Sequence, residues 1–444
     1  MTMHVRRSGR LLSYKGVFAL CWMSYLTAYL CRVNFSVAMG AMSGELGLSA
    51  DRLGMVGAVF FSVYAAGQLV NGFLGDRVRP AGFLLFSLSG MALCNLAVGL
   101  WKSFPGILIF WGLNGYFQSI VWSVIIRILA GAVPPCRRAA ASTFISTSIA
   151  GGYFVSWSLL GQWLDGHGYA LYFLIPTAPA LFMAAAWFAV SRKAGVDARP
   201  EGRIPQRSVK DTVRFIRREK LYLVCAVCVL HGLIKEGIAF WFPSLIHDIL
   251  VLPDASPVLA LAVIPAANLA GMFLSRRLLQ KSRLSTPAIL AGTFALMALA
   301  CAAVWQTGGG ALSIGLIAMV SCLSYALNTI IMAFLPMQYA GENMVASLTG
   351  IFDCASYAGA AVSAYALGRQ ITSGGLSFTA AVWMAAGLLA AGASLVLLCK
   401  TRKQTGKEHF CEQPSANASG LGGHVACGAE DRRVHPGKSR RGGQ

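Results

Sequence analysis

Charged residues are scarce in this chain, and their scarcity excludes an ordinary soluble domain. Only 12% of the 444 residues are charged, whereas soluble domains carry about 25%. Hydrophobic residues make up 56% of the sequence, and they form repeated runs of the ~20 residues that a helix needs to cross a bilayer. We therefore expect an all-α, polytopic membrane protein.

Acidic residues are less frequent than basic residues in this sequence. The 17 Asp and Glu face 37 Lys and Arg, which gives a formal net charge of +20. In a soluble protein this excess would suggest a nucleic acid partner, but here the basic residues lie in short loops between apolar runs, as in the positive-inside pattern. We expect a lipid bilayer as a partner, no nucleic acid, and a monomer. The pattern places both termini in the cytoplasm and the chain in the cytoplasmic membrane.

Motifs for catalysis and for metal binding are also missing. The sequence has no G-x-x-x-x-G-K-[ST], which argues against ATP-driven transport by this chain, and no nucleophile motif. Cys225 and Cys228 form a C-x-x-C inside an apolar run without a second pair. His409, Cys411, His424 and Cys427 lack the spacing of a metal site. We expect no enzyme activity, no metal and no cofactor.

The apolar runs predict about twelve membrane spans in two halves of about six. The charged segment 192–220 separates an N-terminal half at 1–191 from a C-terminal half at 221–399. Its last part, Val209–Lys220, is expected to form an amphipathic helix on the membrane surface. Residues 400–444 are polar and Gly-rich, and are expected to form a disordered cytoplasmic tail. The predicted spans are 16–39, 53–75, 82–101, 106–131, 139–163, 169–191, 221–246, 256–279, 286–305, 311–338, 343–368 and 376–399.

Two cations inside spans are the strongest functional signal. Arg32 lies about two-thirds of the way through the first span, and Lys235 has a similar place in the first span of the second half. A charge at the bilayer centre costs at least ~2.5–3.5 kcal/mol, so it rarely persists without a use. Two cations at matching depth would attract an anion with more than one negative charge. The alternative is that each cation snorkels to the interface.

Polar side chains that share a helix face with other candidates extend the predicted cavity. Tyr25 and Tyr29 precede Arg32 at helical spacing, and Tyr64 and Gln68 form the same pairing in the second span. These residues either line the cavity or make hydrogen bonds between helices.

Several further ionisable residues lie within spans. His231 shares a face with Lys235, whereas Glu236 is expected to point elsewhere. For Glu236, Asp353 and Arg127 we favour internal pairing that neutralises a buried charge. The alternative is that His231, Glu236 or Asp353 carries a coupling proton.

Short motifs resemble a known family. Gly72–Arg77 (GFLGDR) resembles the loop motif of the major facilitator superfamily, and Gly271–Arg276 (GMFLSR) ends the matching span of the second half. More narrowly, the chain resembles the organophosphate:phosphate antiporters, which include glycerol-3-phosphate and hexose-phosphate transporters. The resemblance rests on Tyr25, Tyr29, Arg32, Asn34 and Phe35, on Gly115, Gln118, Trp122 and Arg127, on the stretch around Lys235, and on Gly350, Asp353 and Gly359.

This resemblance implies a twelve-helix facilitator fold and roles for individual residues. Arg32 matches an arginine that binds substrate phosphate, and Lys235 replaces the second such arginine. Gln68 stands where these antiporters often carry a lysine, and Ser148 where one type has a histidine, so a less positive site is expected. Asp76 and Arg77 would serve the cytoplasmic gate.

The sequence thus predicts a secondary transporter that moves a small organic anion by alternating access. An empty cavity with two cations should resist reorientation, which favours obligate exchange. The alternatives are a proton-coupled carboxylate or sugar-acid symporter, and a receptor for sugar phosphates that does not transport them.

Overall fold

The computed structural model describes residues 14–164, 166–193, 209–249, 257–282, 284–342 and 344–411, and these residues form helices and turns without a strand. Helices of the first half are α1 (Tyr14–Leu46), α2 (Ala50–Gly75), α3 (Pro80–Leu100), α4 (Phe104–Ala132), α5 (Arg138–Tyr153), α6 (Gly161–Trp163) and α7 (Tyr169–Lys193). Those that follow are α8 (Val209–Arg218), α9 (Leu221–Ile249), α10 (Pro257–Lys281), α11 (Thr286–Thr307), α12 (Gly310–Asn328), α13 (Leu335–Gln338) and α14 (Val345–Cys411).

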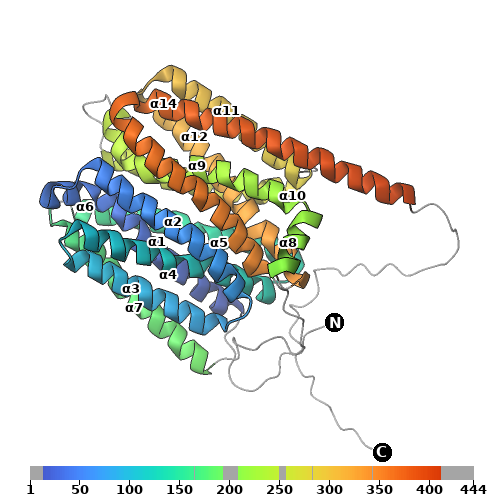
Figure 1. Cartoon of the computed structure of the whole chain (residues 1–444), viewed down its shortest axis with the longest axis horizontal. Coiled ribbons are helices and arrows are strands. Elements are labelled where there is room, and N and C mark those ends of the chain that lie inside the picture. The colour runs from blue at the N-terminus through green and yellow to red at the C-terminus, as the bar shows by residue number, and fades with distance from the viewer. Residues whose placement is uncertain are drawn as a thin grey trace, which may run out of the picture. The chain divides into compact units, whose positions relative to one another are not determined.

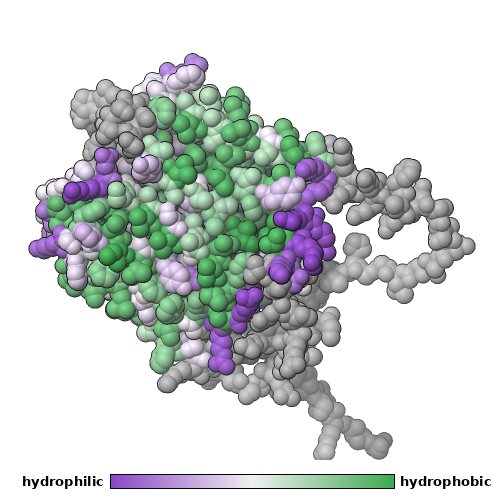
Figure 2. Space-filling view, in the orientation of Figure 1, coloured by the Kyte–Doolittle hydropathy of each residue, from purple (hydrophilic) through white to green (hydrophobic). Residues whose placement is uncertain are grey.

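Ten stretches of the described residues are helices long and apolar enough to cross a membrane. They match ten of the predicted spans, and the two other predicted spans fall on the helical segment 138–163 and on α10. The visible face carries apolar side chains across its middle and hydrophilic side chains at both ends (Figure 2). A surface of this kind suits a protein whose belt faces lipid.

Helix ends follow the residues that start and stop them. Prolines occupy the first turns of α3, α4 and α11, where the missing N–H costs nothing. Ser103 caps α4 by accepting a hydrogen bond from the backbone N–H of Gly106. Gly308 ends α11 with a positive φ of 66°, a conformation that favours glycine.

The long helix α14 contains two of the membrane spans. Figure 1 shows two arms of α14 that run in opposite directions. A Cβ built on Gly237 would lie near both Ser363 Oγ and Trp383 Nε1, which belong to the two arms. The helix continues to Cys411, past the predicted start of the tail at residue 400, and residues 412–444 lie outside the described residues.

The predicted surface helix is present as α8, within the segment 192–220. Residues 194–208 of that segment lie outside the described residues. Thr212 and Phe215 of α8 are buried, whereas Arg214 and Arg218 are exposed, so the helix is amphipathic.

Contacts are concentrated within each half. In the first half α2 packs on α4, α3 on α4 and α7, and α1 on α5 and α7; in the second half α12 packs on α9, α10 and α11. Between the halves, α5 packs on α10 and α2 packs on α14. The cavity described below lies where helices of both halves meet, and the first helix of each half supplies a charged side chain to it.

Candidate anion site between the two halves

The centre of the site is a carboxylate between two cations. Glu236 Oε2 lies 3.4 Å from Arg32 Nη2, and Glu236 Oε1 lies 2.8 Å from Lys235 Nζ. Arg32 comes from α1 in the first half, whereas Lys235 and Glu236 come from α9 in the second. All three side chains are buried, with exposed fractions between 2% and 7%. The two cations therefore meet at one point of the protein.

The position of Glu236 corrects the expectation that it points away from Lys235. Neighbouring residues diverge on a helix, but the ammonium of Lys235 and the carboxylate of Glu236 approach each other to 2.8 Å. Glu236 pairs with Lys235 and, across that space, with Arg32. The cavity therefore does not hold two unpaired cations, and the argument for obligate exchange loses its premise.

Aromatic rings surround the Arg32 guanidinium. Its central carbon lies 4.7 Å from the ring centroid of Tyr357 and 5.1 Å from that of Tyr64. Three more rings lie within 6 Å of it, those of Tyr29, Phe60 and Phe61. The attraction between a desolvated cation and such rings contributes about 2 kcal/mol or more of favourable free energy. The rings hold Arg32 in place without adding negative charge.

Lys235 is held against α12 by one further hydrogen bond. Its Nζ donates to Asn328 Oδ1 at 3.1 Å, and one turn earlier His231 Nε2 lies 2.9 Å from the carbonyl oxygen of Ser324. The two contacts place His231 and Lys235 on one face of α9, as their spacing predicts. The His231 ring also contacts Phe294 of α11 edge to face, with 6.3 Å between the ring centroids.

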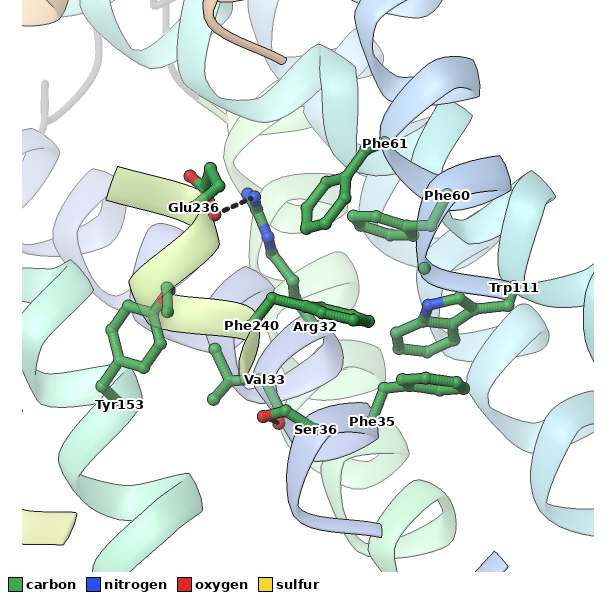
Figure 3. A pocket seen from close by; sticks show the side chains of 12 residues that line it. Arg32, Val33, Phe35, Ser36, Phe60, Phe61, Trp111, Tyr153, Glu236 and Phe240 are labelled. Atoms are coloured by element: carbon green, nitrogen blue, oxygen red, sulfur yellow. Dashed lines mark hydrogen bonds and ion pairs between the residues drawn. The ribbon is translucent and has the colours of Figure 1, made fainter. Parts of the chain in front are cut away.

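A cavity of about 30 Å³ adjoins the ion pair, which is room for a water molecule or two. Arg32, Glu236, Tyr153 and Ser36 give it its polar groups. Figure 3 shows Phe35, Phe60, Phe61 and Trp111 on one side of Arg32 and Phe240 below it. The remaining lining residues are Val33, Gly57 and Ala239. This volume is too small for a sugar phosphate.

A second polar group lies near the first, between α2 and α14. Gln68 Nε2 donates to Asp353 Oδ2 at 2.9 Å and to the hydroxyl of Tyr64 at 2.9 Å. The ring of Tyr64 lies 4.1 Å from that of Tyr357, which also borders Arg32. The structure thus joins Tyr64, Gln68 and Asp353 to the site through Tyr357.

Tyr25 and Tyr29, the two tyrosines predicted to share a helix face with Arg32, both lie in α1 with it. Tyr29 borders the guanidinium, whereas Tyr25 stacks on Trp122 at 4.4 Å. Ser148 is fully buried, and its hydroxyl donates to the carbonyl oxygen of Ile145 in its own helix. Among the predicted substrate residues, Arg32 lines the cavity, whereas the cavity lining does not include Lys235, Tyr25, Tyr29, Tyr64, Gln68 or Ser148.

Asp76 joins the two halves at one end of the bundle, called here the Asp76 end. Its carboxylate accepts hydrogen bonds from the backbone N–H of Ala346 (3.1 Å) and from the backbone N–H and hydroxyl of Ser347 (2.8 and 2.5 Å). These residues form the first turn of α14, where an anion is stabilised by unpaired N–H groups. Burial raises the pKa of Asp76, and the hydrogen bonds from Ser347 oppose that shift.

Arg127 and Arg77 belong to the Asp76 end and not to the cavity. Arg127 donates to the carbonyl oxygens of Gly75 and, at 3.0 Å, of Val78. It therefore holds the turn between α2 and α3, and this corrects its predicted position deep inside the span. Arg77 lies in the same turn, with a half-buried side chain.

Several site residues carry no signal in the sequence. Tyr357 borders Arg32, Tyr153 lines the cavity, and Tyr325 and Asn328 border Lys235. All four are uncharged, so the cost of burying a charge does not single them out. Asn328 and Tyr153 each immediately precede a π-helical turn, at Thr329–Phe334 and Phe154–Leu160. Such turns are frequent at functional sites, but the spacing of apolar residues does not reveal them.

The sequence also predicts that no metal is bound. Within the part of the chain that the structure describes, no three His, Cys, Asp or Glu side chains are grouped as a metal site would need. The side chains of His409, Cys411, His424 and Cys427 lie outside that part.

The helices define a polytopic membrane protein in which buried charged side chains of two halves are paired. Residues 21–364 match the Major Facilitator Superfamily, and the chain belongs to this family. The matched segment includes both Arg32 and Lys235 and most of the membrane helices.

Similar proteins agree with the narrower resemblance. The chain is 28% identical over 142 residues to a probable hexose phosphate transport protein of Chlamydia trachomatis, which covers 32% of this chain and 28% of that protein. It is 28% identical over 192 residues to the hexose-6-phosphate:phosphate antiporter of Escherichia coli K12, with 41% of each covered. It is 30% identical over 197 residues to putative glycerol-3-phosphate transporter 2 of Arabidopsis thaliana, with 40% and 39% covered. The chain therefore matches less than half the length of each relative.

Proposed function

We propose that the chain is a secondary transporter that moves a small organophosphate across the membrane by alternating access, with inorganic phosphate as an exchange partner. The observation that carries this proposal is the meeting of Arg32 and Lys235, from opposite halves, at the carboxylate of Glu236, which lines a cavity together with Arg32. The names of the relatives described above include hexose phosphate or glycerol 3-phosphate, and this supports an organophosphate as the substrate class. The protein is a transporter and not an enzyme.

Paired cations explain how substrate would couple to movement. A phosphate group that contacts both Arg32 and Lys235 links the two halves, so binding favours the closed arrangement. Arg32 offers a planar fork to two phosphate oxygens, whereas Lys235 offers a single compact charge. The surrounding rings lower the local dielectric constant and so strengthen both contacts.

The basic loops favour an orientation with the Asp76 end in the cytoplasm. The turns at 76–79 and 133–137 and the segment 192–220 carry most of the interior Arg and Lys. Under this proposal the chain lies in the cytoplasmic membrane as a monomer, with both termini inside the cell. Asp76 then closes the cytoplasmic end.

Removal of either cation tests the proposed site. In proteoliposomes loaded with inorganic phosphate, uptake of labelled glucose 6-phosphate or glycerol 3-phosphate should fall at least roughly a hundredfold in Arg32→Ala and in Lys235→Ala, because a buried charge contact is worth about 3 kcal/mol or more. Lys235→Arg keeps the charge and should retain much of the uptake.

Arg52→Ala is the matched control, since Arg52 is an exposed cation of α2 that borders Phe104 away from the site. Its uptake should equal that of the wild type. Binding of a phosphate ester without counterflow would identify a receptor and overturn the transport proposal. Normal uptake in Arg32→Ala would remove Arg32 from the substrate site.

A proton-coupled carboxylate or sugar-acid symporter is the second candidate. Two buried carboxylates, Glu236 and Asp353, lie in or beside the site, and intramembrane carboxylates are common proton carriers. Uptake of a carboxylate driven by an inward proton gradient, and indifferent to internal phosphate, would favour this candidate.

A further inference from the structure

Glu236 occupies the place where a substrate anion would bind. Its two carboxylate oxygens face the two cations separately, Oε2 toward Arg32 and Oε1 toward Lys235. Two oxygens on one centre that bridge cations from opposite halves reproduce the geometry expected of a bound phosphate or carboxylate. Figure 3 shows the carboxylate at the end of the guanidinium, on the cavity wall.

A purely structural ion pair would be arranged differently. An internal counter-ion for Arg32 alone would need only one contact, and it would be sealed away from the cavity. Glu236 contacts both cations, and both Arg32 and Glu236 line the cavity. The carboxylate therefore has a water-sized space beside it, into which it can move.

The charges agree with this interpretation. With Glu236 between them, the two cations leave one net positive charge in place of two, and Asp353 adds a further carboxylate behind Tyr357. Bringing two bare cations together at a buried site would cost several kcal/mol per ion. The carboxylate removes most of that cost when no substrate is present.

We propose that Glu236 is an internal anion that bridges Arg32 and Lys235 when the transporter is empty, and that the substrate anion displaces it. This inference rests on the proposed function as an anion transporter. Its consequence is that the empty protein can close and reorient, so net transport occurs alongside exchange. The substrate must carry enough negative charge to compete with a carboxylate already in place, which favours a phosphate group with two charges over a monocarboxylate.

Glu236→Gln tests the proposal because glutamine keeps the shape and removes the charge. Inorganic phosphate is the first probe, and its affinity for the purified protein is measured by calorimetry. The affinity should rise at least roughly tenfold, because a competitor inside the site has been removed. In proteoliposomes the exchange of phosphate should persist, whereas net efflux into phosphate-free buffer should fall at least roughly tenfold.

Two variants control for charge and for folding. Glu236→Asp keeps a carboxylate near the cations and should restore net efflux to within a fewfold of the wild type. Glu45→Gln removes a carboxylate that accepts a hydrogen bond from the backbone N–H of Tyr169, far along α1 from the site, and should change neither property. The unfolding temperature of empty Glu236→Gln should fall, and phosphate should raise it more than in the wild type.

The outcomes separate this proposal from the proposed function. Suppose that the wild type exchanges phosphate esters, while Glu236→Gln keeps the phosphate affinity and the net efflux of the wild type. This result would overturn the role of Glu236 as an internal anion and would leave the proposed function standing. A wild type that ignores phosphate esters, with a Glu236→Gln variant that gains phosphate affinity, would overturn the substrate class and keep the internal anion. No response to phosphate in either protein would overturn both.

Discussion

At the scale of single residues, electrical charge was the signal that the sequence could reveal. Arg32 and Lys235 stand out because a buried cation is costly in a membrane, and the structure brings them to one place. Helix geometry predicts that Glu236 points away from Lys235, because it separates the side chains of neighbouring residues. That rule describes the direction in which a side chain leaves the helix. It does not fix the position of the terminal charged group of a long and flexible side chain.

The aromatic residues around Arg32 show the opposite situation. Phe60, Phe61 and Tyr357 border the guanidinium, but aromatic residues are frequent in any membrane helix. Their selection depends on how α2 and α14 pack against α1, which is a tertiary property. Sequence periodicity alone could not identify them.

Tyr357 offers a prediction about these rings. Tyr357→Leu should lower the affinity for inorganic phosphate by roughly tenfold, because the ring whose centroid lies 4.7 Å from the guanidinium carbon no longer orients Arg32. Tyr357→Phe keeps the ring and should change the affinity less than about twofold. Calorimetry on the two purified variants checks this, and equal losses in both would assign the effect to the hydroxyl group.

At the scale of helices, the spans themselves were predictable but their breaks were not. Runs of apolar residues located the helices because the bilayer requires a minimum length. The π-helical turns at Phe154–Leu160 and Thr329–Phe334 interrupt two predicted spans. An extra residue in one turn leaves the hydropathy unchanged, so the sequence shows no trace of it.

The contact between α2 and α14 depends on two glycines. A Cβ built on Gly350 would lie 2.8 Å from Cα of Gly72, and one built on Gly72 would lie 3.0 Å from the carbonyl oxygen of Ala346. These atoms belong to backbones of opposite halves, which cannot move aside like a flexible side chain. The backbones of α2 and α14 can therefore approach this closely only because Gly72 and Gly350 have no side chains.

Gly350→Ala should prevent the Asp76 end from closing fully while each half stays folded. We expect phosphate exchange to slow at least roughly tenfold, as for a closed state destabilised by about 1.4 kcal/mol or more. Hydrogen exchange should increase in residues 68–76 and 345–353 and not elsewhere. Gly292→Ala is the control, because a Cβ there meets no atom within 4 Å, and loss of exchange in both variants would contradict this explanation.

At the scale of the whole transmembrane bundle, the two halves contact each other on both sides of the Arg32–Glu236 ion pair. Toward the Asp76 end, Trp122 Nε1 donates to the carbonyl oxygen of Met332 at 3.2 Å and Arg138 Nη1 to that of Met337 at 2.7 Å. Toward the other end, Trp241 and Phe240 of α9 pack against Gly54 and Gly57 of α2. The sequence could predict two halves, but the contacts between them are tertiary and no local pattern encodes them.

The hydrogen bonds of Asp76 provide the prediction that belongs to this scale. Asp76 follows α2 in the first half and accepts from the first turn of α14 in the second, so its charge links the halves where unpaired N–H groups and the helix dipole favour an anion. Asp76→Asn removes the charge and one acceptor oxygen. Since hydrogen bonds to a charged group are worth about 1.5–3 kcal/mol, the closed arrangement of this end should lose roughly tenfold or more of its population relative to the open one. Spin labels on exposed Arg79 and Gly341, one in each half, should then show a longer distance in the empty protein.

Asp51→Asn, at an exposed acidic residue in the first turn of α2, should leave the distance unchanged. An unchanged distance in Asp76→Asn would mean that α2 and α14 are held by their glycine contact alone, and the resemblance of GFLGDR to a gating motif would lose its physical basis in this protein.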